Sequence, residues 1–477
     1  MNRRAFLQTT SSAAVAGLSG AQFEPTTPAG HHVPDPAMSQ RPNVIWIFGD
    51  QFRAQSLPFN GDPNARAPNL ERAATNGVTL ARNVSGFPLC CPFRGSLLTS
   101  RYAHQCVPGH EYPLPAGQPT IADVFNANGY DTAYFGKWHL GGWHERDGRA
   151  AFFITDPSRR GGFKTWVGYE NNNSQWDSWV HGGSGKDAFH HRLPGYETDE
   201  LANLLLQHLK KQSADKPFFA VLSVQPPHDP YIAPARFMEN YNPATLQLRP
   251  NVAHSDPIRQ QVRQDLAGYY AMIENLDWNY GRVVEALEQL QLLDNTHILF
   301  FADHGDMHGS HGMYRKTCPY EEAIRTPMII SGGRPRYDNW LVGSPPVTAN
   351  SVDIAPTTLG LCGIPKPQWM AGTDYSHYRI RKPASGPEPD SAYLQNVIPT
   401  GHPDSINTPY RGVVTRDGWK YVCFEGLSWL MFNLNEDPLE EVNLAQNELY
   451  QVERKKLISR LKQWVADTDD RFRLPED

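Results

Sequence analysis

The stretch of sequence that decides the fold is VIWIFGDQ, at residues 44–51. Its five consecutive apolar residues, with no polar alternation, are typical of a β-strand that is buried on both faces. The run ends in Gly49, Asp50 and Gln51. Two polar side chains able to bind a ligand therefore follow the predicted strand directly.

Three further runs, at 131–136, 218–224 and 297–301, are also interpreted as strands. The polar residues that follow them are Lys137 and His139 after the first, His228 after the second, and Asp303 and His304 after the third. Helical patterns at 120–128 and 262–291 lie between the runs, and this alternation predicts an α/β fold with a doubly wound, mostly parallel sheet. Since ligands bind beyond the carboxyl ends of the strands in such sheets, we expect these side chains to form one site.

The last part of the chain has a different pattern. Residues 376–409 are polar and irregular, whereas 410–434 contain alternating stretches that are typical of short antiparallel strands. A charged helix is predicted at 447–467. We therefore expect a catalytic domain at 41–390 and a small C-terminal α+β subdomain, with an antiparallel sheet, at 391–477.

The composition restricts the classes of function. The chain has 477 residues, 20% of them charged, and a formal net charge of −6, which is ordinary for a soluble enzyme. A nucleic-acid partner would require a basic face, so none is expected. Six cysteines in a chain of this length do not indicate a disulfide framework.

The N-terminus begins MNRRAFLQ and continues as a mildly apolar run rich in Ala, Ser and Gly. This pattern resembles a twin-arginine export signal, and the Pro- and His-containing residues after it resemble a linker. We therefore interpret residues 1–40 as signal and linker. The run is too short and too weakly apolar to span a membrane, so a periplasmic or secreted protein is expected.

A second informative stretch is PLCCPFRGSLLTSR, at residues 88–101. Pro92 suits the first turn of a helix, and Cys90 and Arg94 would share one face of that helix. A helix N-terminus beside a guanidinium favours an anionic ligand. Alternatively, the two adjacent cysteines, Cys90 and Cys91, could serve simple packing or form a strained disulfide.

The spacing of Cys90, Pro92 and Arg94 resembles the signature of the type I sulfatases, which belong to the alkaline-phosphatase-like superfamily. Cys91 does not fit this pattern, and Phe93 stands where the family usually has a small residue. The resemblance covers nearly the whole chain from residue 41 and implies an alkaline-phosphatase-like fold. It also implies that a separate maturation enzyme oxidises Cys90 to formylglycine, whose aldehyde hydrate is the nucleophile.

The resemblance further implies a metal site. Its ligands would be Asp50, Gln51, Asp303, His304 and the modified Cys90. Carboxylate and amide oxygens suit a hard divalent cation, Ca²⁺ first, while the imidazole leaves Mn²⁺ or Mg²⁺ as alternatives. Alternatively, the aspartates could cap helices, or a histidine cluster at 304, 308 and 311 could bind zinc.

The catalytic residues implied by the resemblance are Cys90, Arg94, Lys137, His139, His228 and Lys316. The two lysines would hold the sulfate oxygens, and Arg94 would anchor the hydrate. His139 would act as a base when sulfate is expelled, and His228 would contact the sulfate or protonate the leaving oxygen. The charges of three basic side chains and a divalent cation exceed those of the two carboxylates. The resulting net positive charge would stabilise the negative charge of the transition state.

These features predict an exported sulfatase that hydrolyses sulfate monoesters by double displacement. The expected substrate is a sulfated carbohydrate, either a small molecule or an oligo- or polysaccharide, because five Trp and Tyr residues between 143 and 195 could stack on sugar rings. These five are Trp143, Trp166, Tyr169, Trp176 and Trp179, and packing in the core is the alternative for them. A phosphonate or phosphate ester hydrolase of the same superfamily is the alternative. The sequence GKWH at 136–139 favours sulfate. A binding protein without turnover is the remaining hypothesis.

Overall fold

The computed structural model describes residues 41–213, 216–333, 341–402 and 405–476. The expected twin-arginine signal and linker, at 1–40, lie outside the described residues. Within the described ranges, none of the helices combines the length and the apolar character needed to cross a bilayer.

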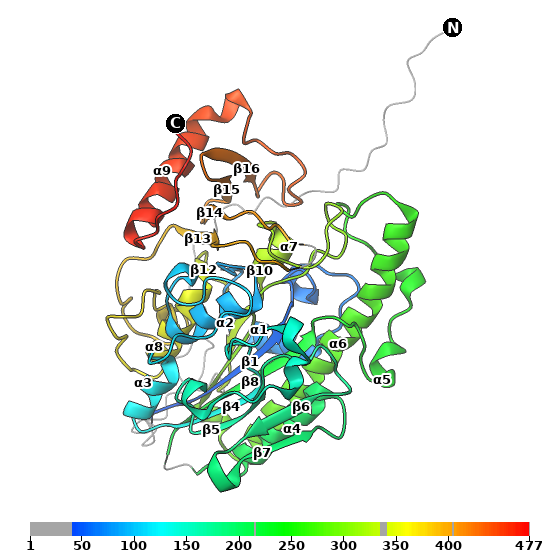
Figure 1. Ribbon diagram of the computed structural model, residues 1–477, viewed down its shortest axis with the longest axis vertical. Coiled ribbons are helices and arrows are strands. Elements are labelled where there is room, and N and C mark those ends of the chain that lie inside the picture. The colour runs from blue at the N-terminus through cyan, green and yellow to red at the C-terminus, as the bar shows by residue number, and fades with distance from the viewer. Residues whose placement is uncertain (1–40, 214–215, 334–340, 403–404, 477) are drawn as a thin grey trace, which may run out of the picture.

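A nine-stranded sheet forms the centre of the larger part of the molecule (Figure 1). In spatial order its strands are β2 (Val78–Thr79), β11 (Met328–Ser331), β9 (Thr296–Ala302), β1 (Asn43–Asp50), β8 (Phe218–Pro227), β4 (Asp131–Lys137), β5 (Thr165–Tyr169), β6 (Trp179–Gly182) and β7 (Phe189–Arg192). The five strands from β9 to β5 run parallel. β11 is antiparallel to β9, and β6 and β7 form an antiparallel edge. The prediction of an α/β fold with a mostly parallel sheet is confirmed.

The side chains of β1 explain why its apolar run is continuous. Ile45 and Ile47 pack into one core cluster, whereas Val44, Trp46 and Phe48 pack into another on the opposite face. Successive side chains of a strand point to opposite faces, so a strand that is covered on both sides needs no polar alternation. All eight residues of β1 are buried.

Helices cover both faces of the sheet. The helices on the Ile45 face are α1 (Pro68–Thr75), α4 (Glu197–Leu209), α5 (Ala235–Met238) and α6 (Asp256–Gln289), and those on the Trp46 face are α2 (Cys90–Thr99), α3 (Ile121–Ala127) and α8 (Ile354–Leu361). The short helix α7 (Glu321–Ile324) precedes strand β10 (Arg325–Thr326). Helix α6 begins six residues before the predicted start at residue 262. The first buried side chain of α6 is Val262, so the apolar periodicity begins only there.

The aromatic segment between 143 and 195 contains the three edge strands β5, β6 and β7 rather than a loop. Trp166 and Tyr169 lie in β5 and are buried. Trp143 stacks on Phe153, with 5.1 Å between ring centroids. Trp176, about half exposed, packs on Tyr196. Packing therefore accounts for aromatic residues that the sequence suggested as sugar-stacking groups.

The C-terminal part is a separate layer that lies at the top of Figure 1. It contains a four-stranded antiparallel sheet and one long helix, as predicted: β13 (Ser391–Asn396), β14 (Tyr410–Thr415), β15 (Trp419–Phe424), β16 (Leu427–Asn433) and α9 (Gln451–Asp467). β13 corrects the prediction that 376–409 is irregular, because its sequence SAYLQN is half polar although every residue is buried. The assignment of the subdomain to 391–477 remains a prediction.

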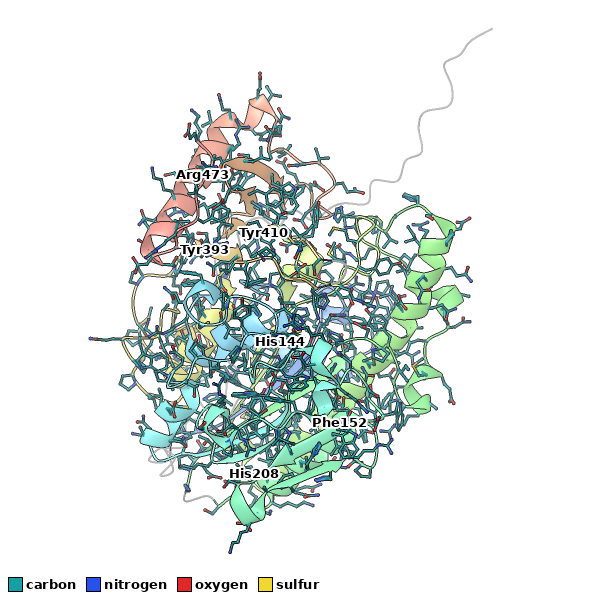
Figure 2. All side chains as sticks on the ribbon, in the orientation of Figure 1. His144, Phe152, His208, Tyr393, Tyr410 and Arg473 are labelled. Atoms are coloured by element: carbon teal, nitrogen blue, oxygen red, sulfur yellow. The ribbon has the colours of Figure 1, made fainter. Side chains whose placement is uncertain are left out.

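A side-chain hydrogen bond connects the C-terminal sheet with the larger part of the molecule. Figure 2 shows Tyr393 and Tyr410 at this junction. The hydroxyl of Tyr410 donates to the carbonyl oxygen of Thr317 at 2.9 Å. A second, three-stranded sheet lies below the junction and consists of β10 (Arg325–Thr326), β3 (Arg82–Val84) and β12 (Thr348–Asn350). The loop that contains Lys316 is thus bound by the C-terminal sheet.

Candidate active site

Six segments that are distant in the sequence meet at the carboxyl edge of the parallel strands. Strand β1 ends at Asp50, β4 ends at Lys137, and His228 follows β8. The other segments are the start of α2, the residues after β9 and the loop before α7. Parallel strands in one sheet end on the same side. The polar residues that follow the short apolar runs of the sequence therefore lie close together in the fold.

Cys90 lies at the centre of this convergence, as the first residue of α2. Its Sγ donates to Oδ1 of Asp50 at 3.4 Å and lies 3.2 Å from Nε2 of His304. Nζ of Lys316 donates to the same sulfur at 3.4 Å. Burial, together with the charge of Asp50, raises the pKa of the Cys90 thiol to about 11. The unmodified thiol is therefore protonated at neutral pH.

Arg94 lies one helical turn after Cys90 and is fully buried. One of its terminal nitrogens donates to Oδ2 of Asp50 at 3.2 Å and to Oδ2 of Asp303 at 3.4 Å. The other donates to the backbone oxygen of Lys137 and to Oγ of Ser223, both at 2.7 Å. The guanidinium thus connects α2 with β1, β4, β8 and the residue after β9.

The two buried carboxylates have different electrostatic environments. Nζ of Lys137 lies 2.7 Å from Oδ2 of Asp50. Burial opposes ionisation of Asp50, but Lys137 and the other nearby bases hold its pKa well below the usual range. Burial and the negative charge of Asp50 raise the pKa of Asp303. A divalent cation beside both carboxylates would favour the ionised form of Asp303.

The donor atoms of the predicted metal site fit a divalent cation. Ligand atoms of Asp50, Cys90, Asp303 and His304 all lie within 4.8 Å of one another. Nδ1 of His304 lies 3.0 Å from the carbonyl oxygen of Gly305, so its proton points there and Nε2 is left free to ligate a metal. Two anionic oxygens and an unprotonated imidazole nitrogen thus face one position.

Gln51 lies at the edge of this group. Its Oε1 accepts from Nζ of Lys316 at 2.9 Å, and its Nε2 donates to Oδ2 of Asp306 at 2.7 Å. These bonds orient the amide oxygen toward the cationic side of the site. The backbone of Gln51 is left-handed, with φ of 67°, and its backbone N–H donates to Oδ1 of Asp303 at 2.9 Å.

His228, His139 and Lys316 line a cavity of about 580 Å³ together with Cys90 and Lys137. Nδ1 of His228 lies 2.8 Å from the carbonyl oxygen of Asp229, and its Nε2 lies 2.9 Å from Nζ of Lys316. Burial and the nearby Lys316 lower the pKa of His228 to about 4. The neutral ring therefore accepts a hydrogen bond from the lysine.

His139 follows β4 by two residues and has a left-handed backbone, with φ of 54°. Burial and the charge of Lys137 lower its pKa well below the usual range, so the ring is neutral. The pKa of Lys316 is shifted in the opposite direction. Burial alone would lower its pKa, but the neighbouring Cys90 and Asp50 raise it.

Every residue of the predicted site thus lies at this edge of the sheet, and the functional roles assigned to them remain predictions. Three supporting residues were missed: Ser223, which binds Arg94, Asp306, which binds Gln51, and Asp229, beside His228. Ser223 had a detectable signal, because it is a polar residue inside an apolar run. All six cysteines are free, so the alternative of a strained disulfide at Cys90 and Cys91 is wrong.

Comparison with known proteins identifies the family. The Sulfatase family model matches residues 42–364. The chain belongs to the sulfatase family. A second model, described as N-sulphoglucosamine sulphohydrolase, C-terminal, matches residues 309–467. The chain is therefore a sulfuric ester hydrolase by family, as the sequence predicted.

Individual members of the sulfatase family resemble the chain over most of its length. It is 33% identical to an ulvan-active sulfatase of Formosa agariphila, over 91% of this chain and 83% of that protein. It is 29% identical to an endo-4-O-sulfatase of Bacteroides thetaiotaomicron, over 79% of this chain and 82% of that protein. The crystal structure of a putative sulfatase from Bacteroides fragilis superposes with a TM-score of 0.80 at 26% identity, covering 93% of this chain and 99% of that one.

Proposed function

We propose that this chain is an exported sulfatase that hydrolyses sulfate monoesters of carbohydrates, with a formylglycine derived from Cys90 and a bound divalent cation. The observation that carries this proposal is the position of the Cys90 sulfur. It contacts Asp50, His304 and Lys316 at the same time, at the wall of a cavity with basic side chains.

The environment of Cys90 supports modification rather than direct use of the thiol. Thiolate, not thiol, is the nucleophilic form of cysteine, and burial raises the pKa of this thiol to about 11. After oxidation by a maturation enzyme, the hydrated aldehyde supplies one hydroxyl to attack sulfur and a second whose proton loss releases sulfate. Arg94 and Lys316 would hold these oxygens.

The cation would be held by Asp50, Asp303, His304, Gln51 and the modified residue 90. The oxygen-rich set favours Ca²⁺, and the imidazole leaves Mn²⁺ or Mg²⁺ as alternatives. A cation at this position would neutralise the close pair of carboxylates. It would also favour a nucleophilic oxygen at residue 90 by electrostatic attraction.

The basic residues would bind the sulfate group of the substrate. Nζ of Lys316 lies 3.4 Å from the Cys90 sulfur. Nζ of Lys137 lies 2.7 Å from Asp50, whose carboxylate contacts the same sulfur. Fixed positive charge in a buried site stabilises the charge that develops on the leaving oxygen, and removal of one such group costs about 10²–10³ in rate. The two lysines therefore supply the main electrostatic contribution from the chain itself.

The histidines would move protons. His139, neutral and facing the cavity, would accept the proton that is lost when sulfate is expelled. His228 holds its Nδ1 against the carbonyl oxygen of Asp229, so Nε2 faces Lys316 and the cavity. An anionic substrate nearby would raise the pKa of His228, and the Lys316–His228 pair would then supply a proton to the leaving oxygen.

The cavity also supports a carbohydrate as substrate. Its lining includes the hydrogen-bonding side chains Glu145, Asn171 and Asn173, which suit the hydroxyl groups of a sugar. The five aromatic residues proposed from the sequence are not among the residues that line the described cavity. The names of the ulvan-active sulfatase and the endo-4-O-sulfatase also support a sulfated polysaccharide or oligosaccharide.

Mass spectrometry tests the modification. Trypsin releases the peptide Asn83–Arg94, which contains both Cys90 and Cys91. Conversion of Cys90 to formylglycine lowers its mass by about 18 Da, and fragmentation of the peptide assigns the change to residue 90. We expect converted protein to release inorganic sulfate from ulvan or glycosaminoglycan oligosaccharides. The Cys90→Ala variant should release none. An unconverted peptide in fully active protein would contradict the proposed nucleophile.

Rates on aryl sulfate and aryl phosphate esters separate the proposal from its alternatives. A sulfatase is expected to have the higher kcat/KM on the sulfate ester. The opposite preference would indicate a phosphonate or phosphate ester hydrolase. Tight binding of sulfated oligosaccharides without turnover, unchanged in Cys90→Ala, would indicate a binding protein.

Export can be tested separately. Residues 1–40, fused to a reporter that is active only outside the cytoplasm, should direct its export. Replacement of Arg3 and Arg4 by lysine should prevent this if the twin-arginine route is used.

A further inference from the structure

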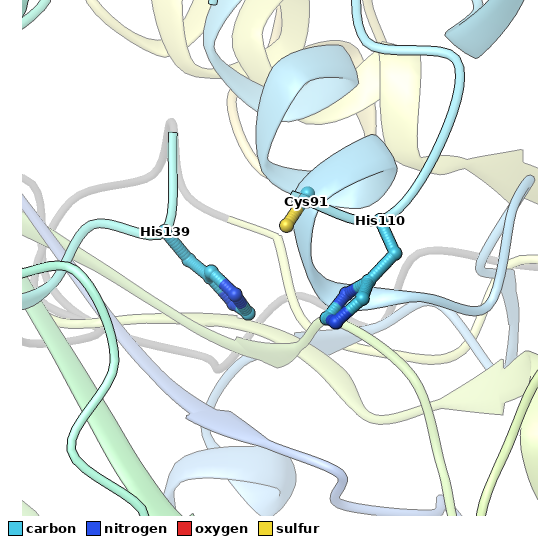
Figure 3. A group of neighbouring side chains, drawn as sticks. All are labelled: Cys91, His110 and His139. Carbon is cyan, nitrogen blue, oxygen red and sulfur yellow. The ribbon is translucent and has the colours of Figure 1, made fainter. Parts of the chain in front are cut away.

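A second group of potential metal ligands, Cys91, His110 and His139, lies beside the proposed catalytic site (Figure 3). One ligand atom from each residue lies within 4.8 Å of the other two. Cys91 belongs to the first turn of α2, His110 to the segment between α2 and α3, and His139 to the segment after β4. A thiolate and two imidazoles are the ligands that Zn²⁺ and other thiophilic cations prefer.

The two histidines have nitrogen atoms available for a ligand. Nδ1 of His110 and Nδ1 of His139 are buried, and neither has a hydrogen-bond partner among the residues that the structure describes. His139 is only 3% exposed, and leaving a buried nitrogen without a partner has a cost in free energy. A bound cation would remove this cost.

The carboxylate beside the other nitrogen of His110 also fits a metal site. Its Nε2 lies 3.7 Å from Oε1 of Glu111. Metal-bound histidines commonly place their other nitrogen against a carboxylate, which fixes the orientation of the ring. Glu111 would therefore leave Nδ1 of His110 as the ligand atom. The rings of His110 and His139 meet edge to face, with 5.7 Å between their centroids.

The cavity provides a route for a cation. His110 and His139 line the cavity of about 580 Å³ that also contains Cys90. Cys91 is fully buried beside them. Figure 3 shows its sulfur and the two rings around a common space. A cation entering from the cavity would meet both imidazoles and then the sulfur, and its fourth position would remain open to water.

We propose that Cys91, His110 and His139 form an inhibitory binding site for Zn²⁺ or a similar thiophilic cation. Binding would form a bond between sulfur and zinc, and the thiol proton of Cys91 would pass to solvent. The site differs from the oxygen-rich group at Asp50 and Asp303, which suits a harder cation. Inhibition rests on the proposed function, because the ligated His139 could no longer accept a proton.

Cobalt spectroscopy tests the binding site without any enzymatic assay. Co²⁺ serves as the probe because a thiolate ligand gives it a charge-transfer absorption in the near ultraviolet. The protein should carry Cys90→Ala, which removes the thiol of the neighbouring oxygen-rich group, and excess Ca²⁺ should be present to fill that group. We expect one equivalent of Co²⁺ to produce the absorption and Zn²⁺ to abolish it by displacement.

Two cysteine variants in this background decide the assignment. Cys91→Ser should abolish the absorption and weaken zinc binding by at least ~100-fold, more than the ~10–100-fold typical of losing an outer partner of a metal ligand. Cys106→Ser is the matched control, because Cys106 is also buried but lies outside the cluster, and it should keep the absorption. Circular dichroism confirms that each variant is folded. Absence of the absorption before substitution, or its survival in Cys91→Ser, would overturn the proposal.

Inhibition is measured on formylglycine-containing enzyme, with each variant compared with its own rate without zinc. We expect Cys91→Ser and His110→Ala to raise the inhibitory zinc concentration at least ~10-fold, while Cys106→Ser leaves it unchanged. Equal inhibition of all variants would overturn the inhibitory role and indicate zinc at the Asp50 group. If the converted enzyme hydrolyses no sulfate ester, the proposed function fails, and the cobalt absorption still decides whether the site exists.

Discussion

Nζ of Lys137 lies 2.7 Å from Oδ2 of Asp50, and neither side chain has any exposed surface. Removal of one partner from an isolated buried ion pair costs about 3–5 kcal/mol, because the other charge is left uncompensated, but Asp50 keeps a second partner in Arg94 at 3.2 Å. We therefore expect Lys137→Met to lower the free energy of unfolding by about 1–3 kcal/mol. The same substitution should lower kcat at least ~100-fold, because it removes positive charge from the substrate site. Denaturant unfolding and steady-state kinetics measure the two effects.

Lys164→Met is the matched control for this variant. Lys164 is exposed, and its Nζ donates to the backbone oxygen of Tyr130 at 2.6 Å. A single hydrogen bond of this kind contributes about 1 kcal/mol, so stability should change little and kcat should not change. A loss of stability in Lys137→Met no greater than in Lys164→Met would show that the Lys137–Asp50 pair does not stabilise the fold.

Calcium should stabilise the protein through Asp303. A ligand that binds only the folded state adds about 2.7 kcal/mol at a free concentration of 100 Kd. Chelation should therefore lower the free energy of unfolding and abolish turnover, and added Ca²⁺ should restore both. In Asp303→Asn the stabilisation by Ca²⁺ should disappear. Denaturant unfolding at several Ca²⁺ concentrations makes the measurement.

Asp374→Asn is the control for the calcium experiment. Asp374 is also buried, but its carboxylate is bound by Lys382 at 2.8 Å and is not among the grouped metal-ligand candidates. This variant should retain the full response to Ca²⁺. If Asp303→Asn keeps the same response, then Asp303 is not a ligand.

The pairing of Asp470 with Arg411 predicts a pH dependence of stability. Burial opposes ionisation of Asp470, but hydrogen bonds from Arg411, at 2.7 and 3.1 Å, lower its pKa to about 2. Because this pKa lies below the unfolded value of about 3.9, the contribution is complete above the unfolded pKa. It is lost as the pH falls toward 2.

We expect Asp470→Asn to cost about 1–2 kcal/mol at pH 7, once solvent screening is allowed for. The difference from the unsubstituted protein should shrink between pH 4 and pH 2, a range taken from the two pKa values. Asp467→Asn, at an exposed position three residues earlier, should change stability by less than ~0.5 kcal/mol at either pH. Urea unfolding at several pH values measures both. A cost that is independent of pH would contradict the lowered pKa.

Local sequence patterns sufficed to predict the central strands. The apolar runs that became β1, β4, β8 and β9 are buried on both faces, and the polar residue that ends each run necessarily lies at the edge of the sheet. Helix α3, at the predicted helical pattern of 120–128, begins at a capping box that Thr120 and Asp123 form. These features depend on neighbouring residues alone, so a single sequence contains the information.

Other elements depend on contacts that a local pattern does not contain. β13 is polar in half of its residues, yet it is buried because Asn350 and Asp470 bind it from other parts of the chain. The position of Lys316 likewise could not be predicted from a local pattern, because no apolar periodicity marks the loop before α7. Only the family motif indicated that this lysine belongs to the site. The structural reason is a set of long-range bonds to the C-terminal sheet.

These long-range bonds give the last prediction. The hydroxyl of Tyr410 donates to the carbonyl oxygen of Thr317, the residue after Lys316, at 2.9 Å. Thr317 has a left-handed backbone, with φ of 72°, so this conformation needs support from its neighbours. Tyr410→Phe should cost about 1 kcal/mol in stability. It should also lower kcat by ~3–10-fold with a smaller change in KM, because small displacements of a charged group weaken transition-state stabilisation.

Tyr393→Phe provides the control, because Tyr393 is a buried tyrosine of the same sheet whose hydroxyl binds Asp470 at 2.8 Å instead of the Lys316 loop. It should lose a similar amount of stability and keep its kcat. Thermal unfolding and steady-state kinetics on one sulfate ester compare the two variants. If both lose kcat equally, the effect arises from general destabilisation. A loss confined to Tyr410→Phe would mean that the C-terminal sheet positions a catalytic lysine, so that the small subdomain takes part in catalysis through the Lys316 loop as well as through Gly401 and His402, which line the cavity.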